Sequence, residues 1–258
     1  MVGGSRRFTG KVALVTGGGH GIGRAIARHL ADLGATVAVN SFHSRQRGEE
    51  TTAEIVASGG KAMHVWGSVT NTEHLNGMFR ELDDRFGGLD FLVHNASNGV
   101  LAPIKDVQPE HWERAFRTNV VALHQASMLA AASMRRRGGG KVVALSSVGA
   151  HRHMDYLGCI GTVKAAVESL VRYLAVELGG DNVQVNAVSA GPVYGELMEQ
   201  YPDLERLRTQ CEALSPRGRL NDEVEVAEAV AFLLGSSGMS GSVLLLDAGG
   251  CQRIRANV

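Results

Sequence analysis

Short apolar runs alternate with longer segments of helical periodicity along the whole chain. KVALVT, TVAVN, LDFLVHN and KVVALSS contain few polar residues, and the spacing of apolar positions predicts helices over 21–33, 46–58, 71–86, 109–137, 158–179, 196–212 and 223–235. Strands that are apolar at almost every position are buried on both faces, as in parallel sheets covered by helices. The pattern predicts an α/β fold with a single Rossmann-type, doubly wound parallel sheet of about seven strands and helices on both faces.

Composition narrows the function classes. The 258 residues contain no Pro/Ser-rich linker, so we expect one domain over 1–258. The 26 basic and 26 acidic residues cancel, which disfavours nucleic-acid and membrane-surface partners. The three cysteines include no C-x-x-C pair, and neither MVGGSRRFTG nor the rest of the chain has a long apolar run. We therefore expect a cytoplasmic protein with a small-molecule or protein partner.

A basic run, RRRGGG, occupies 135–140. It predicts the end of a helix, because basic side chains favour the carboxyl end of the helix dipole and glycine permits a left-handed cap. An anion-binding role is the alternative.

A glycine-rich loop, TGGGHGIG at 16–23, joins the first predicted strand to the first predicted helix. Glycines let the backbone approach a pyrophosphate closely, and the free N–H groups at a helix start favour negative charge. In this context the loop predicts a dinucleotide site. The loop residues expected to contact the cofactor are Gly17, Gly19, His20, Gly21, Ile22 and Gly23.

The loop resembles the T-G-x-x-x-G-x-G fingerprint of short-chain dehydrogenases/reductases, and further motifs follow in that family's order. They are His94-Asn95-Ala96-Ser97, Asn119, Ser146-Ser147, Lys164, Asn186-Ala187, Gly191-Pro192 and Asp247-Ala248-Gly249-Gly250. The resemblance covers nearly the whole chain and implies hydride transfer with a nicotinamide cofactor, in a homo-oligomer (tetramer or dimer). It also implies cofactor contacts from Asn95, Ala96, Lys164, Gly191, Pro192 and Val193.

The segment after the second predicted strand bears on the choice of cofactor. An acidic residue there would bind the ribose hydroxyls and repel a 2′-phosphate, but NSFHSRQR has no acid before Glu49. Arg45 can bind the phosphate, together with His20, His43 and Ser44. NADP(H) is therefore favoured, and ordinary solvated loop residues are the alternative. Ser68-Val69 stands where the family often has Asp-Val beside the adenine.

The usual proton donor of the family is absent. In the family, a tyrosine four residues before the lysine shares its helix face, and the lysine holds the nicotinamide ribose and lowers the tyrosine pKa. Here that position is Ile160, which cannot move a proton, so Lys164 cannot support the standard reaction. Ser147 aligns with the family serine and is expected to shape the pocket. Asn119 is expected to support the helix and a water chain.

Tyr156, eight residues before Lys164, is the nearest candidate donor. Enoyl-[acyl carrier protein] reductases place their tyrosine seven residues before the lysine, where Leu157 stands here. Their NADPH-using, non-standard class is similar in NASNGVLAPIKDVQPEHWE, SSVGAHRH and KAAVESLVRYLAVEL, and in a helical substrate-covering segment that we place near 193–217. One helical residue is a rotation of about 100°. Tyr156 therefore serves only if the helix begins after it and the preceding loop reorients it.

The resemblance implies NADPH-dependent reduction of the carbon–carbon double bond of a 2-enoyl thioester, carried by acyl carrier protein or coenzyme A. Tyr156, Lys164 and Ser147 are then the catalytic residues. Two alternatives stay open. One is a keto- or imine-reductase that uses Tyr156, His153 or water as the donor. The other is a non-catalytic NADP-binding regulator or assembly partner.

Two further groups of charged or metal-ligating residue types have simpler explanations. His151 and His153 have no cysteine or carboxylate at ligand spacing, so no metal site is predicted. Arg206, Arg208, Arg217 and Arg219 can face an acyl carrier protein or its phosphopantetheine phosphate, or form a solvated helix face with the glutamates between them.

Overall fold

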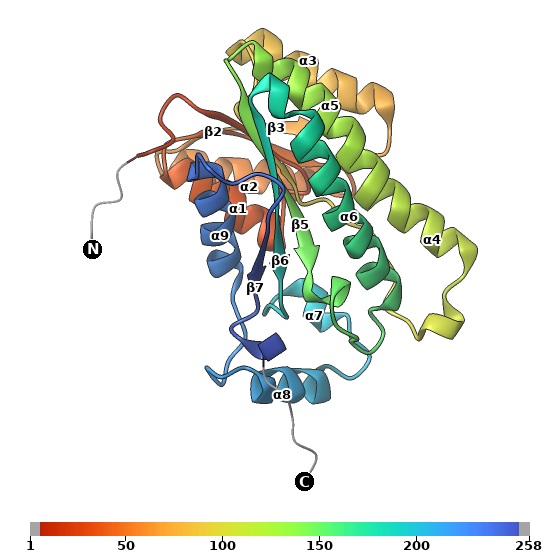
Figure 1. The fold of residues 1–258 in the computed structure, drawn as a ribbon. Coiled ribbons are helices and arrows are strands. Elements are labelled where there is room, and N and C mark those ends of the chain that lie inside the picture. Colours follow the sequence, from red (N-terminus) through yellow and green to blue (C-terminus); the bar gives the residue numbers. More distant parts are fainter. Residues whose placement is uncertain (1–5, 253–258) are drawn as a thin grey trace.

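The computed structural model describes residues 6–252, so part of the N-terminal stretch and the end of the predicted domain lie outside the described residues. Seven strands form one sheet in the order β3-β2-β1-β4-β5-β6-β7, and every neighbouring pair is parallel (Figure 1). The strands are β1 (Val12–Val15), β2 (Thr36–Ser41), β3 (Lys61–Trp66), β4 (Phe91–His94), β5 (Gly140–Ser147), β6 (Val183–Ala190) and β7 (Val243–Leu246). The predicted fold class is confirmed.

Helices cover both faces of the sheet (Figure 1). One core lies between the sheet and α1 (Gly21–Asp32), α2 (Arg45–Ala57) and α9 (Glu223–Gly235). The other lies between the sheet and α3 (Thr72–Phe86), α5 (Ala122–Arg135) and α6 (Gly158–Glu177). Central strands such as β1 and β4 are buried at every residue, because each of their faces packs against a helical layer.

The chain reverses its direction of travel across the sheet beside β1. From β1 it moves outward through β2 and β3, then crosses to β4 on the other side of β1. The carboxyl ends of all strands meet at one edge, and in open parallel sheets the crevice at such a reversal is where ligands bind. The fold therefore brings the loop after β1 next to the loop after β4.

Local sequence signals account for several helix ends. Asn71 caps α3 by accepting a hydrogen bond from the His74 N–H, and Gly87 ends it in the left-handed conformation. The RRRGGG run ends α5 as predicted, with Gly138 and Gly139 at positive φ. Its arginines also form ion pairs: Arg135 with Asp181, Arg136 with Asp83, and Arg137 with Asp90.

The predicted substrate-covering range 193–217 contains two helices, α7 (Glu196–Glu199) and α8 (Leu204–Leu214). Both lie beyond the arrowheads of β5 and β6 in Figure 1, at the carboxyl edge of the sheet. Within the described residues, no helix combines the length and the hydrophobicity that crossing a bilayer requires.

Candidate active site

The loop between β1 and α1 is a tight turn that packs closely against neighbouring backbone. Gly17 and Gly21 have φ values of 63° and 54°, a region that side chains other than glycine rarely adopt. A Cβ on Gly23 would lie 2.2 Å from the Gly17 carbonyl oxygen, and one on Gly19 would lie 2.9 Å from the Gly48 nitrogen. The loop thus requires glycine for its own packing, and its place at the start of α1 fits a pyrophosphate.

The β4 motif holds this loop in place. The Asn95 side-chain amide donates to the carbonyl oxygens of Thr16 and Gly17, each at 3.0 Å. The Thr16 hydroxyl accepts from the backbone N–H groups of Asn95 and Ala96, also at 3.0 Å. The structure therefore brings the predicted cofactor residues of the first and fourth strands together.

The start of α2 presents the polar groups predicted for a 2′-phosphate. Ser44 caps the helix by accepting from the Arg47 N–H at 3.3 Å, and His43 is exposed beside it. Arg45 forms an ion pair with Glu49 on its own helix, with Nε 3.1 Å from Oε1. Arg47, which the sequence interpretation did not single out, extends to Glu196 in α7, with Nη1 2.8 Å from Oε2.

The loop after β3 lies beside an aromatic group at the same sheet edge. The Ser68 N–H donates to His74 Nδ1 at 3.2 Å, and Val69 is buried. The Phe42 and Trp66 rings lie 5.4 Å apart between their centroids and are both partly exposed. Ser68 and Val69 are therefore placed at the edge where the adenine is expected.

Lys164 is buried in the second turn of α6, with only 6% of its surface exposed. Its Nζ donates to the Leu145 carbonyl oxygen at 2.7 Å, and burial lowers its pKa to about 8. His94 is also buried, and burial and the nearby Lys164 charge lower its pKa to about 4. His94 is therefore neutral near pH 7, and Lys164 is the cationic member of this pair.

An apolar, buried side chain stands at the position of the family tyrosine. Ile160 is 7% exposed, and a Cβ on Gly99 would lie 2.3 Å from its Cγ1. The isoleucine side chain thus occupies the space against the loop that follows β4. No proton donor stands at this position, as the sequence indicates.

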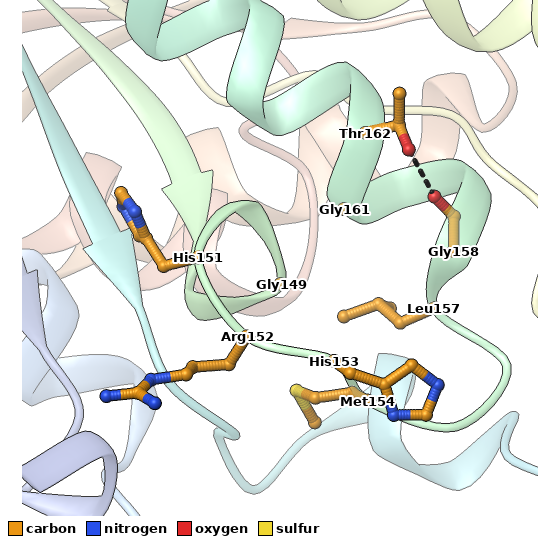
Figure 2. A pocket seen from close by; sticks show the side chains of 9 residues that line it. All are labelled: Gly149, His151, Arg152, His153, Met154, Leu157, Gly158, Gly161 and Thr162. Atoms are coloured by element: carbon orange, nitrogen blue, oxygen red, sulfur yellow. Dashed lines mark hydrogen bonds between the residues drawn. The ribbon is translucent and has the colours of Figure 1, made fainter.

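Tyr156 lies in the loop before α6, which begins at Gly158. Its φ of 64° is left-handed, and its carbonyl oxygen accepts from the Ala102 N–H at 3.0 Å. The helix therefore begins after Tyr156, and the side chain is not bound to the register of α6. Among the described residues its hydroxyl has no hydrogen-bond partner. Leu157 turns toward Gly149 and is buried there (Figure 2).

A buried carboxylate lies one helical turn beyond Lys164. It was not among the site residues that the sequence predicted. Glu168 accepts from the Ser146 hydroxyl at 2.6 Å and lies 2.8 Å from His151 Nε2. Its spacing of four residues from Lys164 places both on the same helix face, which is the signal that points to it. Ser147 points to the opposite side of β5, and its Oγ accepts from the Gly149 N–H at 3.2 Å.

Asn119 lies in a π-helical turn, Arg117–Val121, between α4 (Pro109–Phe116) and α5. Its side-chain oxygen accepts from the Ser97 hydroxyl at 2.7 Å, and its amide donates to the Asn98 carbonyl oxygen at 2.8 Å. The residue therefore ties the helix to the loop after β4. π-helical turns of this kind often occur at functional sites.

Two neighbouring cavities open at the carboxyl edge. The larger, about 250 Å³, is bounded by the loop after β5, the start of the post-β6 segment, α8 and the end of the described chain, and its lining includes His153, Met154, Pro192, Leu214 and Cys251. The smaller, about 220 Å³, lies at the start of α6, with His151, Arg152 and His153 along the loop that leads to it (Figure 2). The lining of neither cavity includes Tyr156.

The segment that follows β6 lies between the larger cavity and the sheet. The Gly191 N–H donates to the Leu246 carbonyl oxygen at 2.7 Å, and Val193 forms a parallel bridge with Asn221. Pro192, between them, lines the larger cavity. These three predicted cofactor residues are therefore placed between the cavity and the carboxyl ends of β6 and β7.

Most of the surface arginines after β6 are engaged within the chain. Arg208 pairs with Glu212, and both Arg217 and Arg219 pair with Glu225. Arg208 lies on α8, whereas Arg217 and Arg219 lie in the loop before α9, and all three contacts are typical of a solvated surface. Across residues 6–252, no cluster of three or more His, Cys, Asp or Glu side chains is arranged to hold a metal ion.

Comparisons with known proteins agree with this geometry. A family model described as enoyl-(acyl carrier protein) reductase matches residues 17–250. A 1-cyclohexenylcarbonyl-CoA reductase of Streptomyces collinus is 35% identical over 93% of this chain and 86% of its own. Versicolorin reductase 1 of Aspergillus parasiticus is 34% identical over 95% and 98%. A 7α-hydroxysteroid dehydrogenase structure with NADH and 7-oxo glycochenodeoxycholic acid has a TM-score of 0.89 and 29% identity, covering 99% and 100% of the two chains.

Proposed function

This chain belongs to the short-chain dehydrogenase/reductase family of oxidoreductases, and we propose that it uses NADPH to reduce the carbon–carbon double bond of a 2-enoyl thioester. The observation that carries the proposal is the buried Ile160 at the position where a ketone-reducing member needs a tyrosine. A ketone must receive a proton on its oxygen as hydride arrives. An enoyl thioester needs only stabilisation of the charge that develops on its oxygen.

The glycine loop supports the dinucleotide part of the proposal, because a Cβ at Gly19 or Gly23 would collide with neighbouring backbone. When bound, NADPH supplies the hydride. Asn95 and Ala96 fix the loop against β4, and the basic start of α2, including Arg45, would hold the 2′-phosphate. That start has no acid before Glu49, which supports NADP(H) over NAD(H).

In the proposed reaction, hydride adds to the β-carbon, the double bond is lost, and negative charge moves to the thioester oxygen. The α-carbon then takes a proton from solvent. The Tyr156 hydroxyl would donate a hydrogen bond to that oxygen, and the left-handed turn at Tyr156 supports this role by freeing the side chain from the register of α6. Lys164, buried and cationic at neutral pH, would hold the ribose and favour the charged oxygen. Ser147 would shape the pocket beside them.

The cavity of about 250 Å³ beside the post-β6 segment would take the acyl group. Val148, Met154 and Leu214 supply apolar surface there. The relative from Streptomyces collinus, named as a reductase of 1-cyclohexenylcarbonyl-CoA, supports a thioester whose double bond is conjugated with the carbonyl. Acyl carrier protein or coenzyme A can carry it.

Ketone reduction is the second candidate, because versicolorin reductase 1 and hydroxynaphthalene reductase-like proteins are also similar over about the same length. His153 lines both cavities and is the side chain to test as donor in that case. Such an enzyme would use the same cofactor site with a different proton source.

The test measures the loss of NADPH absorbance with crotonyl-CoA and, in parallel, with acetoacetyl-CoA and an NADH control. Oxidation of NADPH by the enoyl substrate alone supports the proposal. Turnover of the keto substrate alone favours the second candidate. Binding of NADPH with no turnover of either substrate contradicts both and leaves a different substrate or a non-catalytic role.

We also propose that the chain forms a homo-oligomer. Large apolar side chains are exposed on α6, where Tyr173 and Val176 are 66% and 80% exposed, and on α9 and β7 at Phe232 and Leu245. Such residues commonly cover one another between subunits. Light scattering coupled to size-exclusion chromatography distinguishes a tetramer or dimer from a monomer. Three free cysteines fit a proposed cytoplasmic location.

A further inference from the structure

A carboxylate from the post-β6 segment lies beside two basic side chains, His20 of the predicted phosphate site and Arg47 at the start of α2. Glu196, the first residue of α7, has Oε2 2.8 Å from Arg47 Nη1 and 3.6 Å from His20 Nδ1. His20 caps α1 in the glycine loop, and Arg47 lies in the first turn of α2. One side chain thus bridges both elements that are predicted to meet the cofactor phosphates.

The two arginines in the first turn of α2 are not equivalent. Arg45 is held by Glu49, four residues along the same helix, so this ion pair stays within α2. Arg47 instead reaches across to a different segment of the chain, 149 residues away in sequence. An anion between the glycine loop and α2 would therefore meet Arg47 and would have to exchange with Glu196.

A second carboxylate adds to the negative charge at this place. Glu223 begins α9, and its Oε1 lies 2.6 Å from where a Cβ on Gly195 would stand and 3.5 Å from the same point on Gly21. Burial and the Glu196 charge raise the Glu223 pKa. The two carboxylates are therefore close enough to interact, and both disfavour a phosphate beside the glycine loop.

We propose that Glu196 is an internal competitor for the 2′-phosphate of NADP(H) and that Arg47 is the arginine for which the two compete. The inference rests on the proposed cofactor. Glu196 holds Arg47 and His20 in the free protein, and the phosphate replaces it when the cofactor binds. Glu196 is then a determinant of cofactor affinity, and it connects the substrate-covering segment to the cofactor site.

Direct binding tests the inference without turnover. NADPH is titrated into the full chain, and its fluorescence gives the Kd for the native protein and for Glu196→Gln. The pair is about half exposed on both sides, so its loss is expected to lower the NADPH Kd by about twofold to fivefold. The NADH Kd should change by less than about twofold, because NADH has no 2′-phosphate. Glu199→Gln, in the same short helix, is the matched control and should change neither Kd.

An Arg47→Ala background makes the assignment specific. Arg47→Ala alone should weaken NADPH binding, and in that background Glu196→Gln should change the Kd by less than about twofold. An unchanged or weaker NADPH affinity in Glu196→Gln overturns the inference, since Glu196 would then only position Arg47. An equal gain for NADH also overturns it. If the native chain binds no NADPH at all, the proposed cofactor itself has failed.

Discussion

Replacement of Lys164 by methionine should stabilise the fold while removing function. The ammonium is buried, and burial lowers its pKa from 10.5 to about 8. Keeping it charged at neutral pH therefore costs about 3 kcal/mol, at roughly 1.4 kcal/mol per pKa unit. Methionine has a similar length and no charge, so this cost disappears in Lys164→Met.

The variant also loses one contact. The hydrogen bond from Nζ to the Leu145 carbonyl oxygen is 2.7 Å long, and a bond with a charged donor contributes about 1.5 kcal/mol net or more. The expected gain at pH 7 is therefore at most about 1.5 kcal/mol. For a chain of this size, that corresponds to a rise in Tm of up to about 3 to 6 °C.

The pH dependence identifies the cause of the gain. Below pH 8, Lys164 is protonated in both the folded and the unfolded chain, and the native protein bears the full cost. Between pH 8 and its unfolded pKa of about 10.5, the folded lysine loses its proton first, so the native protein gains stability relative to the variant as pH rises. The advantage of Lys164→Met should therefore be full at pH 7 and near zero at pH 10.

Differential scanning fluorimetry at pH 7 and pH 10 measures both effects. Lys61→Met, at an exposed position of β3, is the control and should shift Tm by no more than about 2 °C at either pH. Lys164→Met should also lose NADPH-dependent turnover. A lower Tm than the native protein at pH 7 refutes the reasoning, as does a gain of equal size at both pH values.

Three other substitutions test the site. Tyr156→Phe should lower turnover by about tenfold or more with an unchanged Kd for NADPH, and comparable turnover in that variant removes Tyr156 from the mechanism. Gly23→Ala should abolish NADPH binding in a fluorescence titration, because the new Cβ would lie 2.2 Å from a carbonyl oxygen; Gly77→Ala, with open space around it, should bind normally. Ile160→Tyr should lower the unfolding free energy in urea by about 1 to 3 kcal/mol through overpacking against Gly99, and an unchanged midpoint contradicts that packing.

The fold could be predicted because its signals are local. Uninterrupted apolar strands and helices with a periodic apolar face determine a covered parallel sheet, and the predicted helix 158–179 differs from α6 by two residues at its end. The glycine loop was equally readable, since its glycine spacing and its place between a strand and a helix are local features of the sequence.

Contacts between distant segments could not be predicted in the same way. Glu196 meets Arg47 only because the fold returns the post-β6 segment to the start of α2, and no spacing in the sequence encodes that meeting. The contact between Glu168 and His151 could not be predicted either. The four-residue spacing from Lys164 to Glu168 indicates only that these two share a helix face. The turn at Tyr156 depends on a backbone conformation that tyrosine rarely adopts. The sequence therefore could not predict whether the helix begins before or after this residue.

The central claim is that hydride reaches the β-carbon of an enoyl thioester. The most direct measurement uses NADPH carrying deuterium at the transferred position, crotonyl-CoA as substrate, and mass spectrometry and NMR of the product. The account predicts butyryl-CoA with one deuterium at the β-carbon. An unlabelled, unchanged crotonyl thioester, alongside deuterium at the carbinol carbon of a parallel 3-ketoacyl reaction, would contradict it.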